Sequence, residues 1–179
     1  MLLGLVMVIT VVTYPQDTVT HKDSVTPPIP APVLAPPPTP TIEQIHYLEG
    51  LKTVTRGVAQ ARDGVNRVVR TEKADSLTRR RAARRMGGLC GTARSFILSG
   101  RPRMQATAYA DSMRILAKQV TMRLDSLSSA LKVCEKTAGQ DPNGVATTLT
   151  SRLKGYDDAL LVFRTALKPD STKAISQQQ

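Results

Sequence analysis

The sequence lacks most of the residues from which catalytic, metal and nucleic-acid sites are built. Its 179 residues include no tryptophan, two phenylalanines, four tyrosines, two histidines and two cysteines. None of the HExxH, CxxCH or CxxC motifs is present, so a metal ion or a covalently attached haem would have no ligands at the required spacing. The adjacent Asp157 and Asp158 point to different sides of a helix and do not converge as an acid–base pair. We therefore expect a protein that is not an enzyme and that holds no cofactor.

A long apolar run is also missing. Residues 1–14 (MLLGLVMVITVVTY) carry no charge, but a membrane-spanning helix needs about 20 predominantly apolar residues. The length is typical of the apolar part of a secretory signal peptide, yet no lysine or arginine precedes it and no small-residue cleavage site follows it. We predict a retained membrane anchor, with a cleaved signal segment as the alternative. The predicted membrane contacts are Leu2, Leu3, Leu5, Val6, Val8 and Ile9.

Proline is concentrated in one stretch. Nine of the twelve prolines lie in residues 15–41, which predicts an extended polyproline II linker. Fully extended at about 3.1 Å per residue, this linker would span roughly 80 Å. Residues 170–179 are mostly polar, and we expect a disordered tail there. The remaining residues, 42–169, are enough for one domain.

Three stripes of apolar residues at helical spacing predict the fold of this domain. They run through positions 51, 54, 58, 61, 65 and 68, from 109 to 134, and from 146 to 167. Thr41 and Gln44 have the spacing of a capping box, and Asp141 and Pro142 that of an N-cap and a first helical residue. The predicted fold class is all-α, an up-and-down bundle of three to four long helices with an aliphatic core. The pattern does not decide between loop and helix for residues 72–82.

Glycine recurs every seventh residue in the first stripe. Gly50, Gly57 and Gly64 each stand beside an apolar stripe position, although a glycine inside a helix costs about 1 kcal/mol relative to alanine. The missing side chain would let a second helix approach closely, so we predict close helix packing at these positions. The alternative is a groove kept open for an external helix or a flat ligand.

Positive charge is concentrated in residues 76–103, which contain eight arginines and no acidic residue. On a helix, Arg80, Arg81, Arg84 and Arg85 fall opposite the apolar side, and Arg79 falls near it. Such a face is either simply solvated or a contact for anionic lipid headgroups or an acidic partner protein. The sequence disfavours nucleic acid as a partner, because no aromatic residues are interleaved with the arginines to stack bases.

The two cysteines, Cys90 and Cys134, both fall on apolar stripes. When an exported protein has only two cysteines, a disulfide between them is the simplest interpretation. However, a regular hairpin turning at Gly100 would place the two roughly 33 Å apart at 1.5 Å per residue, far beyond the reach of a disulfide. A bond would then require the helix to break at Gly87, Gly88 and Gly91. The sequence leaves the pairing open.

Together these features predict a function in assembly. We expect a non-catalytic, membrane-associated helical bundle on the periplasmic, extracytoplasmic side that serves as an accessory or scaffolding subunit of a larger membrane protein complex. A respiratory or photosynthetic complex would be a host of the right kind. The alternative is a free secreted or periplasmic protein that binds a small molecule or an anionic polymer.

Overall fold

A computed structural model of the chain describes residues 39–168, which form four long α-helices. These are α1 (Ile42–Arg70), α2 (Ser76–Gly100), α3 (Asp111–Thr137) and α4 (Pro142–Leu167), with two short 3-10 helices, η1 (Arg101–Arg103) and η2 (Ala106–Ala108), between α2 and α3. The described residues contain no strand. The predicted all-α bundle is confirmed. The predicted anchor (residues 1–14), the linker as far as residue 38 and the tail (residues 170–179) lie outside the described residues.

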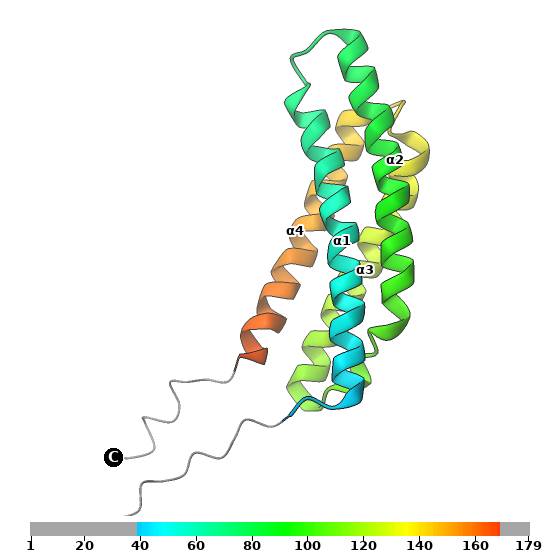
Figure 1. Ribbon diagram of the computed structural model, residues 1–179. Coiled ribbons are helices and arrows are strands. Elements are labelled where there is room, and N and C mark those ends of the chain that lie inside the picture. The colour runs from blue at the N-terminus through cyan, green and yellow to red at the C-terminus, as the bar shows by residue number, and fades with distance from the viewer. Residues whose placement is uncertain (1–38, 169–179) are drawn as a thin grey trace, which may run out of the picture. The chain divides into compact units, whose positions relative to one another are not determined.

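The four helices run alternately up and down the bundle (Figure 1). Each packs on its neighbour in the chain, and α4 closes the ring against α1. The chain therefore enters α1 and leaves α4 at one end, which we call the entry end. The α1–α2 and α3–α4 turns lie at the opposite end, which we call the far end (Figure 1).

Side-chain caps fix where the helices begin. The Thr41 hydroxyl accepts a hydrogen bond from the Gln44 backbone N–H at 3.3 Å, and Gln44 Oε1 accepts one from the Thr41 N–H at 3.1 Å, so the predicted capping box is present. Asp141 caps α4 ahead of Pro142, as predicted. Between α1 and α2 the chain makes a short turn, and α2 starts directly after its N-cap, Asp75. Residues 72–82 are therefore a turn followed by the start of a new helix.

The core is aliphatic, as the composition requires. All six apolar positions of the first stripe (51, 54, 58, 61, 65 and 68) are buried. Three of the core's four buried aromatic residues, Tyr47, Tyr109 and Phe163, pack together near the entry end with ring centroids 5.2–5.4 Å apart, and the fourth is Tyr156. Two expectations need correction. Tyr109 lies before α3 rather than within it, although it is buried, and Leu167, predicted as the last core position of its stripe, is 38% exposed.

Candidate protein-interaction site

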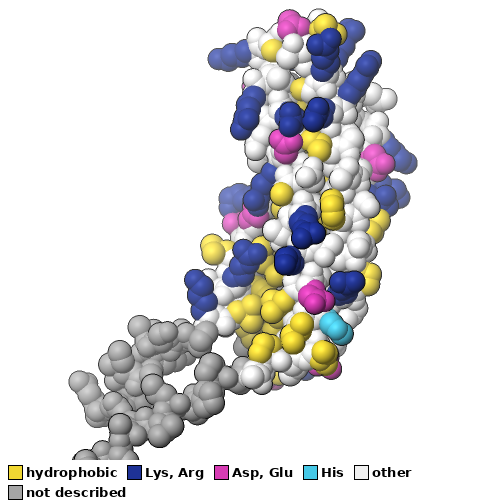
Figure 2. Space-filling view, viewed as in Figure 1, with side chains coloured by type: hydrophobic (Ala, Val, Ile, Leu, Met, Phe, Trp, Pro, Cys, Tyr) yellow, Lys and Arg dark blue, Asp and Glu magenta, His cyan; other side chains and the backbone are white. Residues whose placement is uncertain are grey.

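An arginine-rich surface lies on the first half of α2, at the far end of the bundle. It comprises Arg79, Arg80, Arg81, Arg84 and Arg85, all exposed, and we call it the arginine face. Ala82, Ala83 and Met86 are buried on the other side of the helix, so helical periodicity directs the arginines to solvent. Several Lys and Arg side chains are visible at this end of the molecule in Figure 2.

The arginine face makes no ion pair with the rest of the described bundle. Within residues 39–168, none of its five guanidinium groups has a carboxylate oxygen within 4.0 Å. The arginines just after α2 differ, because Arg101 donates to both carboxylate oxygens of Asp125 at 2.8 and 3.0 Å, and Arg103 lies 3.9 Å from Glu49. The hydrogen bonds to Asp125 raise the pKa of Arg101. The bundle thus pairs the two arginines just after α2, whereas the five of the arginine face make no ion pair among the described residues.

Asp75 is the acidic residue nearest in sequence to the arginine face, but it is committed to the helix start. Its Oδ1 accepts hydrogen bonds from the backbone N–H groups of Leu77 and Thr78, each at 2.9 Å, and its Oδ2 accepts one from the Thr78 hydroxyl at 2.6 Å. These bonds, with the Thr78 hydroxyl contributing most, lower the pKa of Asp75. Asp75 makes no ion pair with the arginine face.

A shallow hollow adjoins the arginine face at the far end. It has a volume of about 290 Å³ and lies between the two turns, with Arg79 and Arg80 on one side and Pro142 and Asn143 on the other. Val68 and Ala83 add apolar surface to it, and Glu72 adds a carboxylate. A guanidinium at the edge of such a hollow can form paired, charge-assisted hydrogen bonds with a carboxylate.

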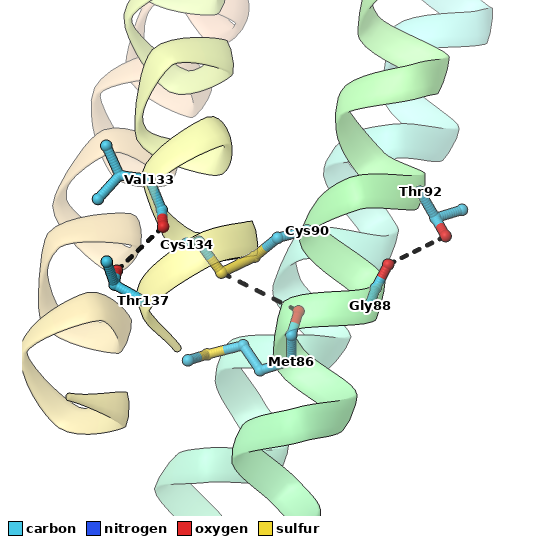
Figure 3. Close-up of a disulfide and its surroundings, with 7 residues drawn as sticks. All are labelled: Met86, Gly88, Cys90, Thr92, Val133, Cys134 and Thr137. Atoms are coloured by element: carbon cyan, nitrogen blue, oxygen red, sulfur yellow. Dashed lines mark hydrogen bonds between the residues drawn. A yellow bond between two sulfur atoms is a disulfide. The ribbon is translucent and has the colours of Figure 1, made fainter. Parts of the chain in front are cut away.

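A disulfide fixes α2 against α3 one turn beyond the arginine face. Cys90 and Cys134 are joined by an S–S bond, with their Cα atoms 6.1 Å apart (Figure 3). The Cys134 sulfur also lies 4.0 Å from the Met86 carbonyl oxygen, which is a contact rather than a hydrogen bond because a disulfide sulfur carries no proton. Both sulfurs are fully buried. The arginine face therefore stands on a helix that is covalently held in place.

The separation of roughly 33 Å calculated for a regular hairpin is wrong, and so is the condition that a bond would require a helix break. α2 is continuous through Gly87, Gly88 and Gly91. The chain does not turn tightly at Gly100; ten residues connect α2 to α3, and they include the buried Met104 and Tyr109. Cys90 lies ten residues before the end of α2 and Cys134 lies 23 residues after the start of α3. The two cysteines reach one level because α3 begins about 20 Å further towards the entry end than α2 ends, at 1.5 Å per residue.

The glycines of α1 face α2. A Cβ atom added at Gly57 would lie 2.6 Å from the Ala93 carbonyl oxygen, and one added at Gly50 would lie 2.7 Å from the Gly100 carbonyl oxygen. At Gly64 the nearest atom would be a side-chain carbon of Met86, at 3.3 Å. The backbones of α1 and α2 thus approach more closely than any side chain would allow. The alternative of an open groove along these glycines does not hold, because α2 occupies it.

A second surface escaped the sequence reasoning. Between α1 and α4, at the entry end, a groove of about 410 Å³ combines the apolar Leu48, Leu51 and Leu167 with the basic Lys52, Arg56 and Arg164. We call it the α1–α4 groove. Its residues come from the two ends of the domain sequence, and each looks unremarkable alone. A local signal exists in α1, where Ile42, Ile45 and Leu48 follow one another on one helix face and are all exposed.

The described residues offer no sign of metal chemistry or of a membrane span. Within residues 39–168, no three His, Cys, Asp or Glu side chains come together as metal ligands. None of the helices in this range is both long and apolar enough to cross a membrane. Comparisons with protein-family models, curated protein sequences and solved structures each found no match for this chain.

Proposed function

We propose that this protein is a non-catalytic, membrane-tethered helical bundle outside the cytoplasm, acting as an accessory subunit that binds an acidic protein partner of a larger membrane complex. The observation that carries the proposal is the arginine face, with five exposed arginines and no carboxylate within 4.0 Å among the described residues. Arg80, Arg81, Arg84 and Arg85 are the proposed contacts.

The isolated bundle is destabilised by this arrangement. Arg80 and Arg84, like Arg81 and Arg85, are four residues apart on one helix, and like charges at that spacing destabilise by about 0.2–0.5 kcal/mol per pair. A partner that places carboxylates against the arginine face would remove the repulsion and add charge-assisted hydrogen bonds. The rigid base of buried alanines and the neighbouring disulfide support this reading, because little ordering entropy would be lost on binding.

The disulfide also supports the proposed location. Disulfides persist in oxidising compartments and are rare where thiols are kept reduced. The Cys90–Cys134 bond is buried within the bundle and joins α2 to α3 through two cysteines that are 44 residues apart in sequence, which is typical of a structural bond. The apolar residues 1–14 and the proline-rich linker complete the proposal as tether and spacer.

The experiment that tests the proposal starts from native membranes. They are solubilised in a mild detergent, separated by size, and searched by mass spectrometry for the intact chain in a large complex. The same experiment is then done with a chain in which Arg80, Arg81, Arg84 and Arg85 are changed to Glu. The matched control carries four charge reversals at exposed residues outside ion pairs on α3 and α4, namely Lys118, Arg123, Lys132 and Arg152.

We expect co-migration at fixed stoichiometry for the unchanged chain and the control, and release of the arginine-face variant from the complex. Co-migration of the arginine-face variant would show that the partner binds elsewhere. A free, N-terminally trimmed chain in the soluble fraction would overturn the tether and favour the secreted binding protein instead. Circular dichroism of each purified variant confirms that its helices are retained.

A further inference from the structure

We propose that the α1–α4 groove is the surface on which the bundle docks to a bilayer containing anionic phospholipid. This inference rests on the proposed function in one respect only, since the tether is what brings the bundle to a membrane. The groove itself supplies the recognition. It places the entry end against the lipid and points the arginine face away from it.

The groove has the two components of a membrane-surface site. Leu48 and Leu167 are 39% and 38% exposed, and Ile45, one turn before Leu48 on the same side of α1, is 41% exposed. Hydrophobic side chains gather at this end of the molecule, with Lys and Arg side chains above and beside them (Figure 2). An apolar patch bordered by cations is the arrangement by which interfacial helices lie on anionic bilayers.

The basic residues of the α1–α4 groove make no ion pair within the described part of the chain. Lys52, Arg56 and Arg164 have no carboxylate within 4.0 Å among residues 39–168. Further along the same α1–α4 seam the pattern changes, because Arg62 pairs with Asp157 and Lys154 pairs with Asp158 at 2.8 Å. The seam between the two helices is therefore neutralised in its middle and left basic only where it opens at the entry end.

The shape of the bundle also distinguishes the entry end of the α1–α4 seam from its middle. In Figure 1 the C-terminal end of α4 leans away from α1 towards the entry end. Leu51, on the floor of the groove, stays 5% exposed, so the groove opens without uncovering the core beneath it. The long stems of Lys52, Arg56 and Arg164 can cover apolar surface while their charged ends reach phosphate groups.

Charge decides between a bilayer and the other candidate occupants. The chain's own residues 1–14 are apolar but contain no acidic group, so they would leave the three cations of the groove uncompensated. A second copy of the chain carries the same excess of +11 and would repel the first. Anionic phospholipid supplies both acyl chains and negative headgroups. The proposed tether leads into α1 at Thr41, which lies within two turns of Leu48.

The absence of tryptophan from the chain allows a direct test on the full-length protein. Leu48→Trp places the only indole in the groove. Leu77→Trp places it at the start of α2 beside the arginine face, on a side chain that is 56% exposed. Each variant is mixed with phosphatidylcholine vesicles with or without phosphatidylglycerol, their acyl chains brominated so that they quench an inserted indole. Leu167→Trp, at a position of similar exposure on α4, serves as a second groove probe if the first variant does not fold.

We expect quenching of the Leu48→Trp indole that requires phosphatidylglycerol, and no quenching of the Leu77→Trp indole. Each cation near an anionic surface strengthens partition about fivefold, so changing Lys52, Arg56 and Arg164 together to Glu should weaken it by about 100-fold or more. The Arg→Glu changes on the arginine face should leave the quenching of the groove indole unchanged.

Three outcomes would overturn the docking surface. Sedimentation of the chain with vesicles while the groove indole stays unquenched would mean that the tether alone holds the bundle. Quenching at Leu77→Trp in place of Leu48→Trp would mean that the arginine face meets the lipid. A groove indole already in an apolar environment without vesicles, and unaffected by them, would mean that the chain covers its own groove. None of these depends on recovering the native complex, so failure of the docking surface and failure of the proposed function are separable.

Discussion

Adding a single methyl group at Gly57 should separate two helices that the structure holds in backbone contact. In Gly57→Ala the new Cβ would lie 2.6 Å from the Ala93 carbonyl oxygen and 2.9 Å from the Phe96 Cβ, whereas ordinary contact begins at 3.4 Å. Restoring ordinary contact from 2.6 to 3.4 Å would require α1 and α2 to move apart locally by up to 0.8 Å. A backbone oxygen cannot rotate away as a side chain can.

The expected magnitude is the balance of two opposing effects. Alanine is favoured over glycine in a helix by about 1 kcal/mol. Overpacking a well-filled interface costs about 1–3 kcal/mol. We expect Gly57→Ala to lower the free energy of unfolding by about 1 kcal/mol, taking the middle of that range. Gly88→Ala is the matched control, because it lies exposed in α2 with no atom within 4 Å of the added Cβ. It should raise the free energy of unfolding by about 1 kcal/mol.

Urea unfolding followed by circular dichroism measures both variants against the unchanged chain. Gly64→Ala provides an intermediate case, since the nearest atom to its new Cβ would be a side-chain carbon of Met86 at 3.3 Å, which can shift, and its other neighbours lie at an ordinary 3.5 Å. We expect the free energy of unfolding to be highest for Gly88→Ala, intermediate for Gly64→Ala and lowest for Gly57→Ala. If Gly57→Ala proved as stabilising as Gly88→Ala, α2 would not be seated on the glycines of α1 and the packing described above would be refuted.

Three further predictions concern the disulfide and the buried tyrosines. Reducing the Cys90–Cys134 bond opens a loop of 44 residues and should lower the free energy of unfolding by about 4 kcal/mol. Denaturation with and without reductant measures this loss, and a chain with both cysteines changed to Ala should show no effect of reductant. Tyr47→Phe should lower the free energy of unfolding by about 1 kcal/mol, because the Tyr47 hydroxyl donates a buried hydrogen bond to the Ala117 carbonyl at 3.2 Å. Tyr109→Phe should be neutral or stabilising, because the buried Tyr109 hydroxyl has no partner among the described residues. Equal losses of stability in urea unfolding would contradict this. Burial raises the pKa of Tyr156 to about 12 from its ordinary 10.0. The stabilisation from this group is therefore complete below pH 10 and is lost as pH rises towards 12. Thermal unfolding across that pH range should show a steeper loss of stability for the unchanged chain than for Tyr156→Phe.

The arginine face and the α1–α4 groove show how far a sequence reveals a surface. Arg80, Arg81, Arg84 and Arg85 lie within one helix, so a 3.6-residue period is enough to place them on one side. Their lack of ion pairs could not be predicted from the sequence. Arg101 and Arg103 belong to the same acid-free segment, yet in the structure they pair with Asp125 and Glu49. The groove was missed entirely, since Arg56 and Arg164 meet only through the packing of α1 on α4.

The positions of the helices were determined by the sequence itself, through caps, prolines and apolar periodicity that act within a few residues of one another. So were the buried face of α1 and the presence of glycines on one flank of it. The tertiary structure decided which helix fills that flank, and it brought Cys90 level with Cys134 through a connection that continues past the end of α2. The physical reason is range. A helix and its inner face depend on contacts within one or two turns, whereas the level of one helix against another depends on how side chains far apart in the chain pack together.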